Sequence, residues 1–200
     1  MIRNLKRTIC IVVACMLFCT LFSCAKKPEP LEMTDDEAKE VLEKLIPLAK
    51  EVNEIFYGKG LEYEDTGEGN VIFMPVAGDS SIKTEADIRV LAEKAYSKAY
   101  LSGVYTMMFD GVKAENADGV VDFAADPRYK EIGGRLYINI GFDSYDLSTE
   151  YDISTAVVSE KTPDYVSVEL SYTVGGKDMG KLKLKLVDQL GEWRLDTPTY

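Results

Sequence analysis

Two short segments of the chain carry residue types at spacings that could support catalysis or metal binding. In the first, Ser80 and Lys83 have the S-x-x-K spacing, in which a lysine can deprotonate the serine hydroxyl. Enzymes that use this pair also carry S-D-N and K-T-G elements, and the sequence contains neither. Because the segment directly precedes a helix-capping signal, we interpret it as a surface loop.

The second segment, residues 114–119, is similar to the start of a calcium-binding loop. Asn116, Asp118 and Gly119 occupy the third, fifth and sixth places of such a loop. However, Ala114 stands at the first place and Ala125 at the twelfth, where the loop needs acidic ligands. The sequence therefore predicts a polar turn here and no metal site.

The chain contains no histidine, and its four cysteines all lie at or before position 24. The absence of histidine excludes Ser-His-Asp and Cys-His catalysis and histidine-ligated zinc. Carboxylate pairs, a Ser-Lys dyad and oxygen-ligated calcium are the constellations that remain. We assign no catalytic residue, no metal and no cofactor, and we expect a protein that is not an enzyme.

Tyrosine is the residue type that most suggests a binding surface, since it offers contact area together with a polar tip. Seven of the twelve tyrosines lie in the C-terminal part of the chain, and sheet packing is the alternative explanation for each of them. The candidate binding residues are Tyr129, Tyr137, Tyr172 and the acidic side chain Glu169.

The N-terminal segment has the layout of a secretory signal peptide. Arg3, Lys6 and Arg7 precede an uncharged apolar run over residues 9–22, which is too short to span a bilayer as a helix. The run ends in Leu21-Phe22-Ser23-Cys24, which resembles the bacterial lipobox. This resemblance implies cleavage before Cys24, lipidation of its thiol, and a protein anchored to the cell membrane on its extracytoplasmic side.

We therefore expect a signal peptide over residues 1–23, a lipidated tether over 24–33, and a single domain over 34–200. Cleavage would remove three basic residues and no acidic ones, moving the formal charge from -11 to -14. Such a charge repels phosphate backbones, so nucleic acid is not an expected partner. With no cysteine left to form a disulfide, the domain must depend on its hydrophobic core.

Helical signals dominate the first half of the domain. Thr34 and Glu37 form a capping box before apolar residues at helical spacing, which predicts one bent helix or two short helices over residues 35–57, interrupted by Pro47. A second capping signal at Thr84 predicts a helix whose inner face includes Tyr96 and Ala99. Between them, residues 61–63 and 71–74 are typical of a hairpin.

The second half alternates apolar and polar residues in the manner of strands. The alternating rows lie over residues 136–142, 153–157, 166–174, 182–186 and 193–195, with short connections at 162–164, 175–176 and 190–191. We predict an α+β fold in which N-terminal helices pack on a curved antiparallel sheet. Trp193 is expected to be largely buried there.

Three segments together resemble a known group of proteins: residues 126–137, residues 151–156, and the ending at residues 191–200. The set is similar to small clostridial-type lipoproteins grouped with the IseA-type inhibitors of DL-endopeptidases, and to the cystatin-like or nuclear-transport-factor-two-like layout. The resemblance implies a non-catalytic binding module that regulates a basic cell-wall hydrolase. The alternative function is small-molecule binding in a cavity enclosed by the sheet.

Overall fold

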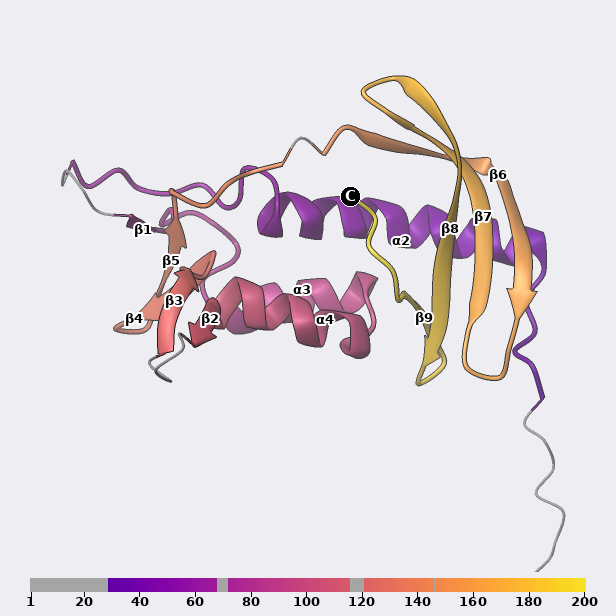
Figure 1. Ribbon diagram of the computed structural model, residues 1–200, viewed down its shortest axis with the longest axis horizontal. Helices are drawn as coiled ribbons and strands as arrows, with labels where there is room; N and C mark the ends of the chain where they lie inside the picture. The colour runs from indigo at the N-terminus through magenta and orange to yellow at the C-terminus, as the bar shows by residue number, and fades with distance from the viewer. Residues whose placement is uncertain (1–28, 68–71, 116–120, 146) are drawn as a thin grey trace, which may run out of the picture. The chain divides into compact units, whose positions relative to one another are not determined.

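The computed structural model describes residues 29–67, 72–115, 121–145 and 147–200, and Figure 1 shows their arrangement. Residues Leu31–Tyr200 form one compact unit. Its helices and antiparallel sheets belong to the α+β class, which is the class that the sequence predicted. The expected signal peptide, Cys24 and most of the calcium-like segment lie outside the described residues. No helix of the described part is long and apolar enough to cross a membrane.

The longest helix, α2 (Asp35–Phe56), begins at the predicted capping box. The Thr34 hydroxyl accepts a hydrogen bond from the Glu37 amide at 3.2 Å, and the Glu37 carboxylate accepts one from the Thr34 amide at 2.7 Å. Of the two forms that the sequence allowed, the structure has one continuous helix. Pro47 lies on the exposed side, where the carbonyl that it leaves without a donor can be solvated.

The second predicted helix is divided into α3 (Glu85–Ala95) and α4 (Lys98–Tyr105). The expectation of one helix through Tyr96 was wrong, because Tyr96 has an extended backbone and forms a parallel bridge with Leu195. Ser97 then caps α4 through its hydroxyl, which accepts from the Tyr100 amide at 3.0 Å. A π-helical turn, η1 (Thr106–Asp110), continues α4.

A three-stranded antiparallel sheet has the order β1 (Phe73–Pro75), β5 (Arg135–Asn139), β4 (Tyr129–Ile132), and a separate hairpin joins β2 (Val112–Glu115) to β3 (Val121–Ala125). Residues 61–63, which the sequence predicted to form a hairpin with the segment of β1, form no strand and make a single bridge, between Tyr63 and Val76. The apolar row that begins at Leu136 is buried only within β5, since Ile140 lies beyond its end and is 43% exposed.

The larger antiparallel sheet contains β6 (Thr149–Lys161), β7 (Val166–Val174), β8 (Lys177–Gln189) and β9 (Glu192–Leu195), in chain order. All three of its connections lie where the sequence predicted turns. Val166, Val168, Leu170, Leu184 and Leu186 form its buried face. A bulge between Asp152 and Val157 breaks the predicted apolar row on β6 and leaves Val157 40% exposed.

Helix α2 connects the two sheets (Figure 1). At its start, the Asp35 carboxylate accepts a hydrogen bond from the Val158 amide of β6 at 2.7 Å. At its end, the Ile55 carbonyl accepts one from the Tyr129 hydroxyl of β4 at 2.8 Å. The apolar face of α2 lies between these two anchors and belongs to the same hydrophobic core as the buried faces of both sheets.

Candidate binding surface

The candidate residue Tyr129 is part of the core and not of a surface. Its side chain is fully buried, and its hydroxyl donates to the Ile55 carbonyl at 2.8 Å and accepts from the Leu61 amide at 3.1 Å. Burial raises the pKa of this phenol to about 12, so the hydroxyl stays protonated at neutral pH. Tyr129 therefore holds the end of α2 against β4.

The other three candidates lie apart from one another. Tyr137 is a partly buried residue of β5 in the small sheet, on the opposite face from Tyr129. Glu169 and Tyr172 both belong to β7, but their positions along the strand place them on opposite faces of the large sheet. Glu169 pairs with Lys183 of β8 at 3.7 Å. The four residues therefore do not form a single site.

Of the four, Tyr172 lines a surface groove. The groove has a volume of about 560 Å³ and lies across β6, β7 and the start of β8; it is lined by Glu150, Tyr151, Asp152, Ser171, Tyr172, Thr173 and Asp178. We call it the acidic groove. In the sheet register, Glu150 of β6 is opposite Thr173 of β7, and Thr173 is opposite Asp178 of β8. Two carboxylates therefore flank one hydroxyl across three strands. Asp152 pairs with Ser171 in the neighbouring row.

Two of the three carboxylates of the acidic groove are held by local turns. Asp152 accepts hydrogen bonds from the Ser154 amide at 3.2 Å and the Ser154 hydroxyl at 2.5 Å, within the β6 bulge. Asp178 accepts one from the Gly180 amide at 2.8 Å. None of the carboxylates of Glu150, Asp152 and Asp178 forms an ion pair with another described residue. Their charges are therefore available to a partner.

Tyr151 and Tyr172 are directly opposite each other on β6 and β7 and also border the acidic groove, but strand alternation places their side chains on the other face of the sheet from Glu150, Asp152 and Asp178. Burial raises the pKa of Tyr151 far above its ordinary value, and its buried hydroxyl has no hydrogen-bond partner among the described residues. A phenol of this kind remains neutral. The acidic groove therefore presents its carboxylates together with the Ser171 and Thr173 hydroxyls, whereas the Tyr151 hydroxyl is buried.

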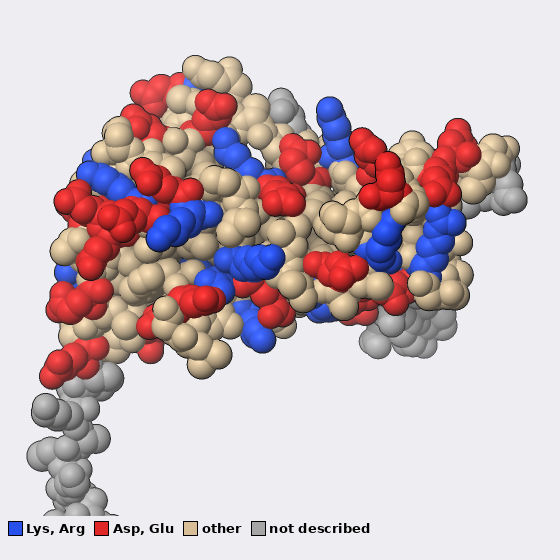
Figure 2. Space-filling model, turned by 180° about the vertical axis from the view of Figure 1, so that it is seen from behind, with Lys and Arg blue, Asp and Glu red and all other residues tan. Residues whose placement is uncertain are grey.

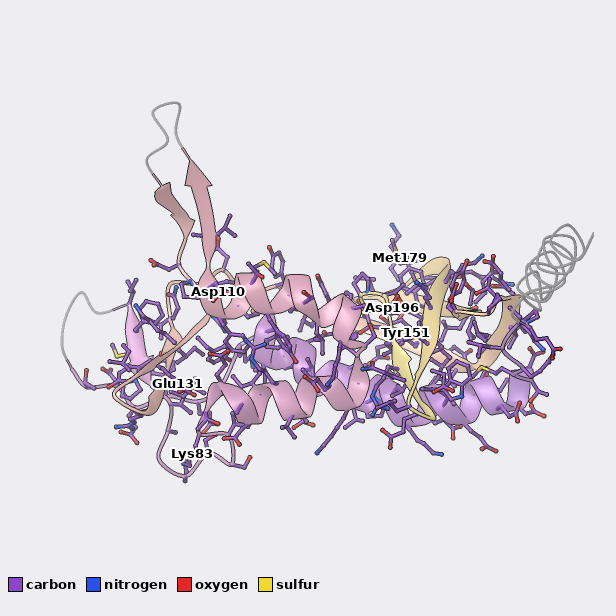
Figure 3. The ribbon with its side chains drawn as sticks, turned by 90° about the horizontal axis from the view of Figure 1, so that it is seen from below. Lys83, Asp110, Glu131, Tyr151, Met179 and Asp196 are labelled. Atoms are coloured by element: carbon purple, nitrogen blue, oxygen red, sulfur yellow. The ribbon has the colours of Figure 1, made fainter. Side chains whose placement is uncertain are left out.

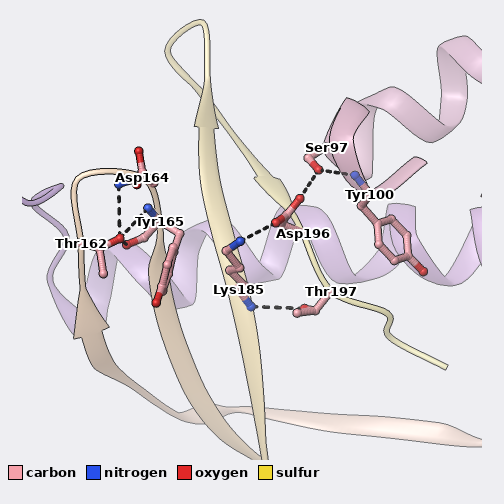
Figure 4. A network of polar contacts seen from close by, with 8 residues as sticks. All are labelled: Ser97, Tyr100, Thr162, Asp164, Tyr165, Lys185, Asp196 and Thr197. Carbon is pink, nitrogen blue, oxygen red and sulfur yellow. Dashed lines mark hydrogen bonds and ion pairs between the residues drawn. The ribbon is translucent and has the colours of Figure 1, made fainter. Parts of the chain in front are cut away.

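Lysines limit the extent of the acidic surface. Lys181 is opposite Ser171, and Lys183 and Lys185 follow it along β8 on the same face. Lys185 pairs with Asp196 at 2.7 Å, and Asp196 also accepts a hydrogen bond from the Ser97 hydroxyl that caps α4, as Figure 4 shows. On the face seen in Figure 2, acidic and basic side chains are likewise interspersed. The acidic groove is thus a local feature.

Trp193 lines a second groove, and its side chain is partly buried against the core, where the sequence predicted a largely buried ring. Its ring is partly exposed and packs against α2 in a hollow of about 460 Å³, together with Val41, Leu45 and Leu48. Lys44, Lys94, Glu192 and Arg194 complete the lining. Trp193 belongs to the short edge strand β9, where it is opposite Asp188 of β8. The core therefore covers only one side of its ring.

The catalytic candidates do not assemble into a reactive pair. Ser80 accepts a hydrogen bond from the Ile82 amide at 3.1 Å, whereas the Lys83 ammonium donates to the carbonyls of Ala77 and Gly78. Lys83 lies near Glu131 of the small sheet, whereas Tyr151 lies in the large sheet (Figure 3). Among the described residues, no group of His, Cys, Asp or Glu is arranged to hold a metal ion.

The described carboxyl groups with a shifted pKa all have it lowered, which disfavours a role as a general acid. Hydrogen bonds from backbone and side-chain donors lower the pKa values of Glu37 and Asp87 in the two capping boxes. The Arg135 guanidinium and the Gly78 amide do the same for Glu64. A general acid at neutral pH needs a raised carboxyl pKa, so these three side chains serve as caps and ion-pair partners.

Comparison with protein families finds no family model that matches this chain. Comparison with curated proteins finds no significant relative.

Proposed function

We propose that the protein is a lipid-anchored, extracytoplasmic binding module without catalytic activity, and that the acidic groove binds a cationic partner. The observation that carries this proposal is the convergence of Glu150, Asp152 and Asp178, without described ion-pair partners, on one face of the large sheet beside Ser171 and Thr173. Carboxylates accept charge-assisted hydrogen bonds from the side chains of lysine and arginine.

The partner class that we favour is a basic cell-wall hydrolase, whose activity the protein would inhibit. This part of the proposal depends on the resemblance to the IseA-type group and on the lipobox at Cys24. Both proteins would then face the same compartment. The acidic groove supports the idea on physical grounds, since a rim of like charges accelerates association with a cationic surface and disfavours anionic competitors.

The test is an inhibition assay with the full-length chain in a non-ionic detergent. A purified DL-endopeptidase digests peptidoglycan, and the release of soluble fragments is followed as the protein is added. We expect the rate to fall saturably. An unchanged rate, together with no binding to the immobilised hydrolase, would contradict the choice of partner. Binding without inhibition would keep the binding module and contradict the inhibitor.

A further inference from the structure

Arg128, immediately before β4, carries a positive charge inside the protein. Its side chain is only 3% exposed, and no carboxylate of a described residue lies within ion-pair distance of its guanidinium. Removing an arginine from water costs several kcal/mol unless a negative charge or enough acceptors replace the lost hydration. The position of Arg128 therefore requires an explanation.

Part of the explanation is a set of backbone carbonyls. Nη1 of Arg128 donates to the carbonyls of Asn139 at 3.1 Å and Phe142 at 3.5 Å, and Nη2 donates to the carbonyl of Gly58 at 3.0 Å. Gly58 lies just beyond Tyr57, the C-cap of α2, whose last turn contains no basic residue, so the guanidinium also offsets the negative end of that helix dipole.

These carbonyls do not use every donor of the guanidinium. Arginine has five N–H groups, and the one on Nε has no described acceptor. Nε is also buried. Carbonyl dipoles carry partial charges only, so a full negative charge and an acceptor for Nε are missing from the described surroundings of Arg128.

Arg128 lines a pocket in which a bound anion could supply the missing negative charge. The pocket has a volume of about 220 Å³ and is lined by Lys59, Tyr63, Arg128, Ile138, Ile140, Phe142 and Ser144. The Arg128 guanidinium lies 5.0 Å from the centroid of the Phe142 ring. Lys59 adds a second cation without a described ion-pair partner, and no acidic residue contributes to the lining.

We propose that this pocket binds a small carboxylate that carries an apolar group. The carboxylate would be held by Arg128 and Lys59, with Ser144 as a hydroxyl donor, and the apolar group would contact Ile138, Ile140 and Phe142. A volume of about 220 Å³ is below the usual 300–1,000 Å³ of sites for drug-sized ligands, so the ligand is a molecule of amino-acid size. The site is independent of the acidic groove, since it belongs to the small sheet.

The test measures binding by NMR, using backbone amide shifts of the full-length chain in non-ionic detergent. Phenylacetate is the probe, 2-phenylethanol is its neutral match, acetate lacks the ring, and inorganic phosphate is the competing anion. We expect phenylacetate to shift the amides of residues 138–144 and to bind at least about tenfold more tightly than the other three. Equal binding of 2-phenylethanol, or tighter binding of phosphate, would overturn the proposal.

Variants at the pocket rim keep this test independent of folding. Lys59 and Ile140 are both exposed, so K59Q and I140W should fold normally. K59Q should weaken phenylacetate binding several-fold, and I140W should abolish it by filling the pocket. The control is K50Q, which removes an exposed lysine of α2 outside the pocket lining. Unchanged binding in I140W, with amide shifts elsewhere in the protein, would place the ligand at another site and overturn the proposal.

Discussion

Asn53 of α2 and Thr199 are joined by two hydrogen bonds inside the protein, although 146 positions separate them in the sequence. The Asn53 amide donates to the Thr199 hydroxyl at 2.9 Å and to the Thr199 carbonyl at 3.2 Å. Tyr96 completes the contact, since its hydroxyl donates to the Asn53 side-chain carbonyl at 2.9 Å and also contacts the Thr199 hydroxyl. This buried network ties the end of the chain to α2 and to the junction between α3 and α4.

The network should contribute measurably to stability. T199V removes the hydroxyl at nearly constant volume and should lower the free energy of unfolding by about 1–2 kcal/mol, while N53L should cost about 2–3 kcal/mol. Denaturant unfolding of both variants and of the double variant completes a thermodynamic cycle. We expect a coupling of about 1 kcal/mol, because the two side chains share one bond. Strict additivity would contradict the hydrogen bond.

Gly60 should tolerate alanine poorly, because its φ is +81° and because an added Cβ would lie about 2.4 Å from Nη2 of Arg128 and 2.5 Å from Ile138. The matched control is G176A, since Gly176 has a φ of +77° but no neighbour within 4 Å of that position. We expect G176A to cost about 1 kcal/mol and G60A about 3 kcal/mol, as measured by denaturant unfolding. Equal costs would show that Arg128 does not lie against Gly60.

The buried tyrosines should make the fold sensitive to alkali. Burial raises the pKa values of Tyr96 and Tyr129 to about 12, from about 10 in the unfolded chain. Because the folded state holds these protons more tightly, the resulting stability is complete below about pH 10 and is lost as pH rises toward about 12. Near-ultraviolet phenolate absorbance should show exposed tyrosines ionising first and the buried ones only as the protein unfolds. A single transition near pH 10 in the folded protein would contradict this prediction.

Cys24 should be the only residue needed for lipidation. C24A should leave an uncleaved precursor that incorporates no labelled fatty acid, because the thiol that receives the lipid is absent. Cells expressing each form are labelled with a fatty acid, and the protein is then isolated and analysed. C19A is the control, since Cys19 belongs to the expected signal peptide, and it should be processed normally. Labelling of C24A would contradict the proposed anchor.

Local signals in the sequence predicted much of the fold. Both capping boxes, the antiparallel order of the large sheet and its three connections depend on residues that are close along the chain, and all are present. The break at Tyr96 could not be predicted in this way, because it depends on a bridge to Leu195 about a hundred residues later. The β6 bulge likewise depends on the pairing with β7.

The candidate binding residues were harder to predict for the same reason. Tyrosine content indicates that a surface or a core is rich in tyrosine, but strand pairing decides which face each ring occupies. Thus Tyr129 is buried and Tyr172 lines a groove. Asp152 and Asp178 were indistinguishable from the other acidic residues until the bulge and the register brought them beside Ser171 and Thr173. Arg128 carried no sequence signal for burial.

The proposed role of the acidic groove can be tested with two variants of equal charge. One replaces the groove carboxylates (E150Q, D152N, D178N), and the amides keep the turn hydrogen bonds of positions 152 and 178. The other replaces three exposed acidic residues elsewhere (E40Q, E43Q, D79N). Each variant changes the net charge by three units. Any difference between them therefore reports on the position of the charge and not on its amount.

The decisive measurement is the affinity of each form for an immobilised DL-endopeptidase, from about 50 mM to about 500 mM salt. The wild type should bind most tightly at low salt and weaken steadily as salt rises, because the charges in the groove become screened. The groove variant should bind at least about tenfold more weakly at low salt and depend little on salt, while the control variant stays close to wild type. Equal affinities for all three forms, or a wild-type affinity that does not change with salt, would contradict binding through the acidic groove.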